Sequence, residues 1–162
     1  MSRSHLLADA KNVKLLDLLS RDPRLPVADL ARAIGLSAPA TRERLARLME
    51  EGVIRGFRLD IDPAALGLPM TAIVRLRPAP GNLPKVTELA RKTPHVVECH
   101  RVTGEDCLVL KVLLPTVEAL EPLLDRFLAY GNTTTSIVQS TPVPTRLPPL
   151  VGAGPSPDGR GR

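Results

Sequence analysis

The chain has 162 residues, of which 43% are apolar and only 2% aromatic, and its formal net charge is +5 at pH 7. This length suits one ordinary domain or two small ones, and any core must be aliphatic. Scarce aromatic side chains disfavour single-stranded nucleic-acid modules, which stack bases on aromatic faces, whereas the positive charge is compatible with a polyanionic partner.

The chain carries no predicted signal for export or membrane insertion. Its start, MSRSHLLADAKN, lacks a long apolar run, and no window approaches the roughly 18 apolar residues of a membrane span. Two cysteines without a secretory signal indicate reduced thiols. We therefore expect a cytoplasmic protein with no membrane contact.

Three helices are predicted in the first third of the chain, over residues 6–20, 27–34 and 37–51. The second and third are separated by Gly35, which can end a helix in a left-handed conformation, and by Ser37, which can cap the next helix. Two short helices with a tight turn between them are typical of a helix-turn-helix, whose second helix enters the DNA major groove. Ordinary helical packing is the competing interpretation.

The third helix separates an apolar stripe from a polar face. Thr41, Leu45 and Leu48 fall within roughly 60° of each other at 100° per residue, so they are expected to face the core. Arginines dominate the outward side, and residues 20–58 carry more arginines than acidic residues. The candidate DNA contacts are Ser37, Ala38, Pro39, Arg42, Glu43 and Arg47.

A strand over residues 53–61 is expected directly after the third helix, as in a winged or strand-backed DNA-binding module. A linker turn then begins at Asp62-Pro63 and runs to Pro69. Beyond it the pattern predicts the order βαββαβ, the split βαβ or ferredoxin-like motif. The expected elements are a strand at 71–77, a helix at 83–92, strands at 95–102 and 107–113, a helix at 116–130 capped by Thr116 and stopped by Gly131, and a strand at 133–140.

The two middle strands are expected to form a hairpin around a loop of residues 103–106. This loop places Glu98 opposite Lys111, an attractive cross-strand pair worth roughly 0.2–1 kcal/mol, and Val97 opposite Val112. One face of the hairpin is mainly apolar and is expected to pack under the helices. The other face is mixed in character, as is common where a sheet meets another subunit.

The predicted fold class is therefore α+β, with an N-terminal helix-turn-helix domain followed by a ferredoxin-like βαββαβ domain. The tail is rich in proline and glycine and is expected to be disordered. The expected divisions are residues 1–52 for the helix-turn-helix, 53–69 for the strand and linker, 70–141 for the ferredoxin-like domain and 142–162 for the tail.

The order of these elements and several strings within them resemble the Lrp/AsnC family of leucine-responsive or feast/famine transcription regulators. The strings are LARAIGLS, TRERLARLMEEGVIRGFR, DPAALGL, VVECHRVTGEDCLVLKV and TTTSIV, within residues 6–140. The resemblance implies a sequence-specific regulator that binds double-stranded DNA and responds to an amino acid or related metabolite. It also implies homodimers that assemble into higher oligomers.

By position, the resemblance places the effector near the loop between the second and third strands, with the last strand nearby. Backbone N–H groups beside Gly104 can bind a carboxylate, and Glu105 or Asp106 can bind an ammonium. A plain hairpin turn is the competing interpretation, and Cys107 stands where many members carry an acidic residue. The candidate effector residues are Val102, Thr103, Gly104, Glu105, Asp106, Thr134, Thr135 and Ser136.

Two other function classes remain as alternatives. A DNA-organising protein of the same fold would bend or wrap DNA without sensing an effector. An enzyme is disfavoured because His5, His95 and His100 have no metal-ligand spacing and the chain lacks a glycine-rich phosphate loop, a Cys-x-x-Cys motif and a nucleophile elbow. No catalytic residues, cofactor or metal are therefore expected.

Overall fold

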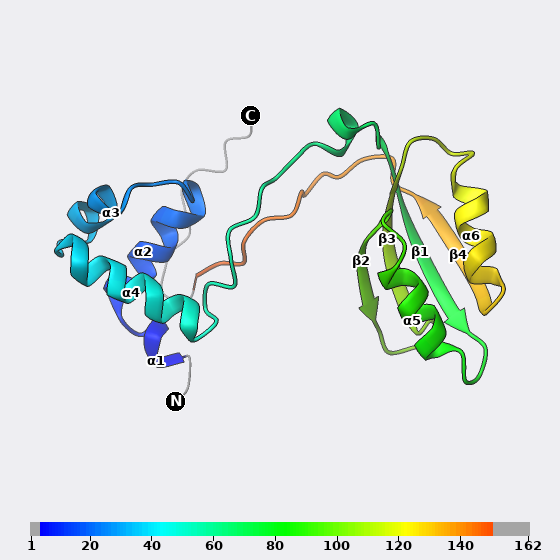
Figure 1. The fold of residues 1–162 in the computed structure, drawn as a ribbon, viewed down its shortest axis with the longest axis horizontal. Coiled ribbons are helices and arrows are strands. Elements are labelled where there is room, and N and C mark those ends of the chain that lie inside the picture. Colours follow the sequence, from blue (N-terminus) through cyan, green and yellow to red (C-terminus); the bar gives the residue numbers. More distant parts are fainter. Residues whose placement is uncertain (1–3, 151–162) are drawn as a thin grey trace. The chain divides into compact units, whose positions relative to one another are not determined.

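The computed structural model describes residues 4–150. The chain divides into two compact units (Figure 1). The first, here the helical unit, runs to Leu59 and includes the segment from Thr145, and the second, here the sheet unit, runs from Asp60 to Pro144. No helix among the described residues combines the length and apolar character needed to cross a bilayer.

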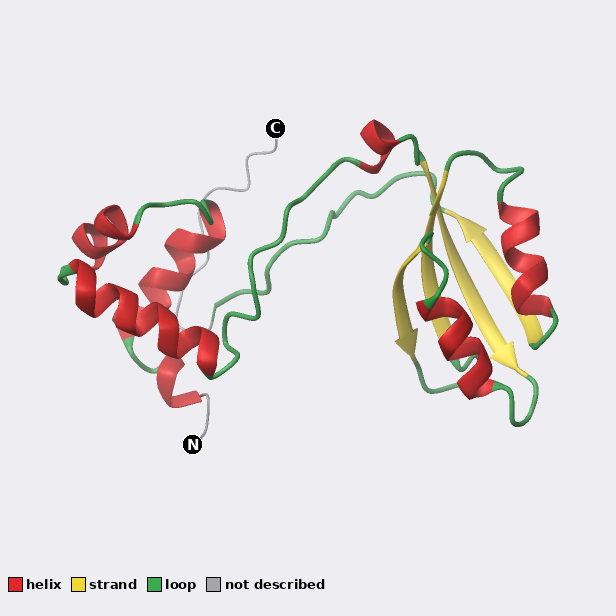
Figure 2. Cartoon of the chain, viewed as in Figure 1, coloured by secondary structure: helices red, strands yellow, loops and turns green. Residues whose placement is uncertain are grey.

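The described residues of the helical unit form four helices (Figure 2), which are α1 (Ser4–Leu7), α2 (Ala10–Arg21), α3 (Val27–Ile34) and α4 (Ala38–Glu50). The predicted helices at 27–34 and 37–51 agree with α3 and α4. The single helix predicted at 6–20 is wrong, because it is broken into α1 and α2. Asp9 stands at the break, where its Oδ1 accepts a hydrogen bond from Lys11 N at 2.8 Å and caps α2.

The core of the helical unit is aliphatic and small. One buried residue comes from α1 and the others from the three longer helices. Half-buried side chains pack around them, including Val53 and Ile54 from the segment after α4. The buried core residues are Leu6, Leu15, Leu19, Leu30, Ile34 and Leu48.

The strand predicted at residues 53–61 is wrong, since this segment contains no strand. The N–H groups of Val53 and Ile54 both donate to Leu48 O at 2.9 Å, so the chain continues directly from the helix end. Phe57 and Leu59 are exposed and, among the described residues, no strand pairs with this segment. The segment alternates apolar and polar residues as a strand would, but its backbone has no neighbouring strand with which to form hydrogen bonds.

The sheet unit confirms the predicted α+β, ferredoxin-like order. Its four strands form one antiparallel sheet in the order β2-β3-β1-β4, with α5 and α6 on one face (Figure 1). Its elements are the 3₁₀ turn η1 (Pro63–Leu66), β1 (Met70–Pro78), α5 (Leu83–Arg91), β2 (Val96–Arg101), β3 (Leu108–Leu114), α6 (Leu120–Leu128) and β4 (Gly131–Ile137).

Side chains alternate between the two faces of the sheet, and this alternation builds the core. On the central strands β1 and β3, the even-numbered residues 72–76 and 108–114 are buried under α5 and α6. Odd-numbered residues of these strands, among them Arg75, Arg77 and Lys111, lie on the opposite face, here the outer face. The buried residues are Ala72, Val74, Leu76, Val86, Ala90, Leu108, Leu110, Val112, Leu114, Leu123 and Phe127.

The predicted hairpin register is confirmed from Glu98 to Arg101, including Glu98 opposite Lys111. The pair of Val97 with Val112 is wrong: the register shifts between Val96 and Glu98, so Val96 stands opposite Val112. Val97 is the extra residue of this irregularity and is 46% exposed.

The boundaries of the last helix and strand also differ from expectation. Helix α6 begins at Leu120 after Ala119, so Thr116 does not cap it. Gly131 is the first residue of β4 rather than a helix stop. A Cβ atom at Gly131 would lie 2.2 Å from Arg77 O, so this position requires glycine for close approach to β1.

The predicted disordered tail, residues 142–162, is covered only in part. Residues 142–150 contain neither helix nor strand. Residues 151–162 lie outside the described part of the chain.

Candidate DNA interface and effector site

The turn between α3 and α4 has the geometry that the sequence predicts. Gly35 ends α3 in the left-handed region with φ 66°, and Leu36 N donates to Ala31 O at 3.0 Å. Ser37 then caps α4, since its Oγ accepts a hydrogen bond from Ala40 N at 3.4 Å. The turn thus fixes where α4 begins relative to α3.

Helix α4 places its candidate DNA contacts on the outside of the helical unit. Thr41 and Leu48 are fully buried, and Thr41 Oγ1 donates to Ser37 O at 3.0 Å, so Thr41 faces the core as expected. The other candidates lie on the cap or on the opposite side of the helix. Ala38 is half-buried, whereas Ser37, Pro39, Arg42, Glu43 and Arg47 are exposed.

The arginines from Arg21 to Arg47 fall into two groups. One group forms ion pairs within the unit, at N–O distances from 2.5 to 3.8 Å: Arg21 with Asp17, Arg24 with Asp22, Arg32 with Asp29 and Arg44 with Asp9. Within residues 4–150, no carboxylate lies within ion-pair distance of Arg42 or Arg47. These two guanidinium groups are therefore available for a base edge or a phosphate.

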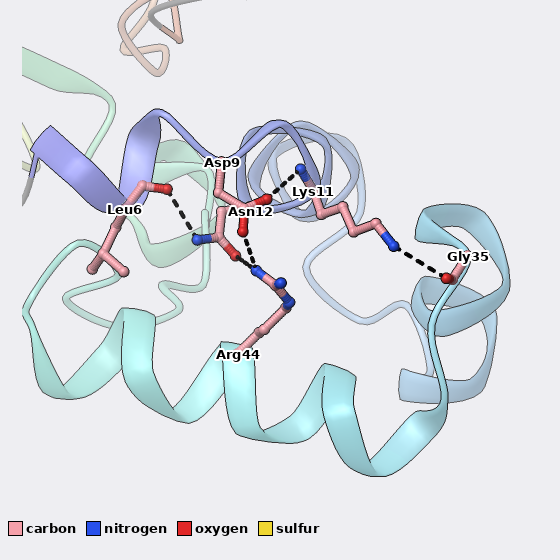
Figure 3. Close-up of polar contacts among 6 residues, drawn as sticks. All are labelled: Leu6, Asp9, Lys11, Asn12, Gly35 and Arg44. Atoms are coloured by element: carbon pink, nitrogen blue, oxygen red, sulfur yellow. Dashed lines mark hydrogen bonds and ion pairs between the residues drawn. The ribbon is translucent and has the colours of Figure 1, made fainter.

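Arg44 lies on the same helix but has a different environment, which the sequence did not reveal. Its Nη1 donates to Asp9 Oδ2 at 2.5 Å and to Asn12 Oδ1 at 2.9 Å (Figure 3). The hydrogen bond from Arg44 lowers the pKa of the Asp9 carboxyl below its ordinary value. No local signal could identify this contact, because it joins residues 35 positions apart.

The candidate effector loop, residues 103–106, joins β2 to β3 and lies beside the end of β1. Cys107 N donates to Leu76 O at 3.0 Å, and Val102 N donates to Cys107 O at 3.0 Å. Gly104 has φ 107°, a conformation that favours glycine, although a Cβ atom there would meet nothing within 4 Å. The loop backbone is therefore held at its ends and open in its middle.

Both loop carboxylates lie next to arginines from β1. Arg77 Nη2 contacts Glu105 Oε2 at 2.8 Å, and Arg77 Nε donates to Glu105 O at 2.8 Å. Arg75 Nη1 lies 3.6 Å from Asp106 Oδ2. An ammonium group that binds either carboxylate must therefore compete with a guanidinium.

A hollow of about 230 Å³ opens between this loop and the outer face of β1 and β4. It is smaller than the roughly 300–1,000 Å³ of sites for drug-sized ligands, so only a small ligand fits. The hollow is lined by Arg75, Arg77, Glu105, Asp106, Asn132 and Thr134.

Register divides the three β4 candidates between the two faces of the sheet. Thr134 stands opposite Arg75, so it shares the outer face with the hollow, and Ser136 lies on this face as well. Thr135 stands opposite the buried Val74 and faces the helices, where its Oγ1 is buried without a hydrogen-bond partner in the described residues. The structure therefore separates Thr135 from Thr134 and Ser136. Of the eight candidates, Glu105, Asp106 and Thr134 are the ones that line the hollow.

Sequence reasoning missed Arg75, Arg77 and Asn132 as lining residues. A usable signal was present for the arginines, because they alternate with buried apolar residues along β1 and must share the outer face. Asn132 is brought to the hollow by its pairing with Arg77.

Comparison with known proteins matches each unit to a described domain. Residues 9–55 match a winged helix-turn-helix DNA-binding domain, and residues 71–148 match the Lrp/AsnC ligand binding domain. The first match covers α2 to α4, although the segment after α4 carries no strand. The second covers the four-stranded sheet from the second residue of β1 onward, together with both of its helices.

Several regulators are similar to the chain over most of their length. The uncharacterised HTH-type regulator YezC of Bacillus subtilis is 33% identical over 82% of this chain and 94% of its own. A proline dehydrogenase transcriptional activator of Rhizobium radiobacter is 30% identical over 87% of this chain and 96% of its own. The solved structure of the leucine response regulatory protein LrpA of Mycobacterium tuberculosis is similar to this one, with a TM-score of 0.74. The two sequences are 30% identical over 86% of this chain and 97% of LrpA. The chain belongs to the Lrp/AsnC family of transcriptional regulators.

Proposed function

We propose that this protein binds specific duplex DNA sequences through α4 and that its DNA affinity responds to an amino acid or related metabolite. The observation that carries the DNA-binding part is the outward face of α4, where Arg42 and Arg47 stand free of the carboxylates of the described residues. A bidentate arginine–guanine contact contributes about 1–3 kcal/mol of discrimination. The positive balance of the unit adds a sequence-independent attraction to phosphates.

The effector part rests on the hollow beside residues 103–106. Arginines, carboxylates and the Thr134 hydroxyl converge there, which suits a small ligand that carries both a carboxylate and an ammonium. Two relatives carry names that refer to proline dehydrogenase activation and to a leucine response. Proline and leucine are therefore the first effectors to test.

A homodimer, and larger assemblies of it, belong to the same proposal. The outer face of the sheet carries half-buried apolar residues such as Ile73, Val109 and Leu113. Charged groups lie beside them, and Lys111 Nζ donates to Glu98 Oε1 at 3.2 Å. A second copy would cover this face, and paired DNA-binding units would gain avidity. Light scattering across a dilution series tests this, and a monomer at every concentration would contradict it.

The DNA-binding proposal is tested with Arg42→Ala. A duplex selected from a random pool by the wild-type protein serves as the probe in a gel-shift titration. Affinity for this duplex should fall by about 1–3 kcal/mol. Arg21→Ala is the matched control, since Arg21 is already paired with Asp17 at 3.1 Å, and its affinity should stay at the wild-type level. Unchanged affinity in Arg42→Ala would remove this residue from the readout.

The effector proposal is tested by thermal melting of the protein with each of the twenty amino acids. A ligand at 100 times its Kd stabilises the folded state by about 2.7 kcal/mol, which is a measurable shift. The amino acid that stabilises should also change the affinity for the selected duplex. A flat response across all twenty would favour the DNA-organising alternative, which senses nothing.

A further inference from the structure

Helix α4 has little apolar support on one of its flanks. Its fully buried residues are Thr41 and Leu48, both of which face the core. Towards the start of α2 lies a hollow of about 370 Å³, lined on the α4 side by Ala40, Glu43, Arg44 and Arg47. Close packing of side chains does not fix the orientation of α4 on this side.

A polar contact spans this hollow instead. Figure 3 shows the Arg44 side chain extending from α4 to Asp9 and Asn12 at the first turn of α2. Both acceptors are themselves fixed. Asn12 is 4% exposed and donates through Nδ2 to Leu6 O at 2.9 Å, while the other carboxylate oxygen of Asp9 caps α2. The guanidinium is therefore held by groups that cannot follow it if α4 moves.

A second contact joins the same turn of α2 to the turn between α3 and α4. Lys11 Nζ donates to Gly35 O at 3.3 Å, at the residue that ends α3 (Figure 3). The first turn of α2 thus contacts both the turn before α4 and the middle of α4. One contact therefore holds the turn that leads into α4, and the other holds α4 itself at Arg44.

We infer that Arg44 is a positioning residue for DNA recognition, which sets the orientation of α4 through Asp9 and Asn12 without contacting DNA. The inference rests on the proposed function of α4. Arg44 lies between Arg42 and Arg47 on one helix, so a rotation of α4 displaces both guanidinium groups from their targets. Small displacements of preorganised groups cost affinity for the cognate partner far more than for a generic one.

Asp9→Ser and Arg44→Gln test this inference in the full chain. Serine still caps α2 but is too short to reach Arg44, and glutamine removes the charge of Arg44. Anisotropy titrations use the selected duplex and a scrambled duplex of the same length, at several salt concentrations and below each variant's melting range. Arg44→Lys tests rescue, and Arg21→Gln is the control, because its ion pair lies within α2 alone.

Both variants should bind the selected duplex up to about fivefold more weakly, the fold-change that corresponds to about 1 kcal/mol for a partly exposed ion pair. For the scrambled duplex, the affinity of Arg44→Gln should stay near wild type and Asp9→Ser should bind no more weakly than wild type. The salt dependence should be unchanged in both, and Arg44→Lys should recover part of the loss. For Asp9→Ser, the direction of the change in DNA affinity is decisive. Removal of a negative charge should tighten DNA binding on electrostatic grounds alone, whereas loss of positioning weakens it.

Two results would overturn the inference while leaving the proposed function intact. In the first, melting temperatures fall but the selected duplex is bound as by wild type, so that Arg44 only stabilises the fold. In the second, Asp9→Ser binds more tightly and Arg44→Gln loses about one unit of salt slope, as expected of a direct phosphate contact. A wild-type protein that selects no duplex would instead overturn the proposed function, and this inference with it.

Discussion

The helical unit and the sheet unit stabilise their functional elements in different ways. In the sheet unit, buried residues from two strands and two helices form one continuous apolar core, and the outer face is left for other contacts. In the helical unit the apolar core is smaller, and contacts such as that of Arg44 with Asp9 supplement it. An apolar pattern can therefore specify a sheet almost alone, whereas helix orientation here also depends on individual polar contacts.

This difference predicts how substitutions act in each unit. Apart from Thr135, which faces the helices, the candidate effector residues stand on a loop and on the outer face, so the sheet separates them from the core. Candidate DNA contacts stand on a helix whose own core residues are few. Changes in the sheet core should alter stability alone, whereas changes around α4 should alter stability and recognition together.

The largest effect is expected for Phe127→Ala. Phe127 is fully buried in the sheet core, and removal of such a ring costs about 3–5 kcal/mol of unfolding free energy. Hydrogen exchange should accelerate in the sheet unit, while amides of α2 to α4 keep their protection. Equal acceleration in both units would mean that they do not unfold independently.

Gly131→Ala is expected to have the next largest effect. The new methyl group would lie 2.2 Å from Arg77 O and 2.6 Å from Pro78 Cα, both backbone atoms, so β4 must shift away from β1. Such overpacking costs about 1–3 kcal/mol, measurable by denaturant unfolding. Asn132→Ala, at the next and exposed position, is the control and should stay within about 0.5 kcal/mol of wild type.

Acid should weaken the helical unit through Asp9. The folded state lowers the pKa of Asp9, so this carboxylate contributes stability at neutral pH and loses it as pH falls from the ordinary value of 3.8 through the lower folded value. Both side chains are about one-third exposed, so the effect should be below about 1 kcal/mol. The stability of α2 to α4, measured by amide hydrogen exchange, should depend less on pH in Asp9→Ser than in wild type. Identical pH profiles would contradict the role of this ion pair.

The smallest effect on stability is expected for Arg77→Gln. Its partner Glu105 has a side chain that is 89% exposed, and such surface ion pairs contribute about 0–1 kcal/mol. The variant should melt at the same temperature as wild type, yet the concentration of the amino acid that gives half of its stabilising effect should change. Arg91→Gln, which breaks an exposed pair on α5, is the control. An unchanged effector midpoint would remove Arg77 from the site.

Much of the fold follows from local patterns in the sequence. The glycine turn with its serine cap located α3 and α4, and the four-residue loop set the hairpin register from Glu98 to Arg101. These features depend on neighbours in the chain, which a sequence displays directly. The alternation of apolar and polar residues at 53–61 gave a wrong prediction of a strand, because a strand also needs a pairing partner, which a local pattern does not reveal.

The candidate sites were only partly predictable for the same reason. Arg42 and Arg47 could be assigned to the outer side of a helix from spacing alone. The role of Arg44 depends on Asp9, far away in the sequence, and the lining role of Asn132 depends on strand pairing. The face of Thr135 followed from the register of β4 with β1, which no local pattern fixes.

The central claim is that the helical unit binds DNA and the sheet unit binds the effector. Hydrogen exchange of the full chain in three states tests it most directly. The protein is measured alone, with the selected duplex and with the amino acid that stabilises it. We predict that the duplex slows exchange in the turn at Gly35 and along α4, and that the amino acid slows exchange in residues 102–106 and 132–136. Protection by the duplex on the outer face of the sheet, with α4 unchanged, would contradict the account.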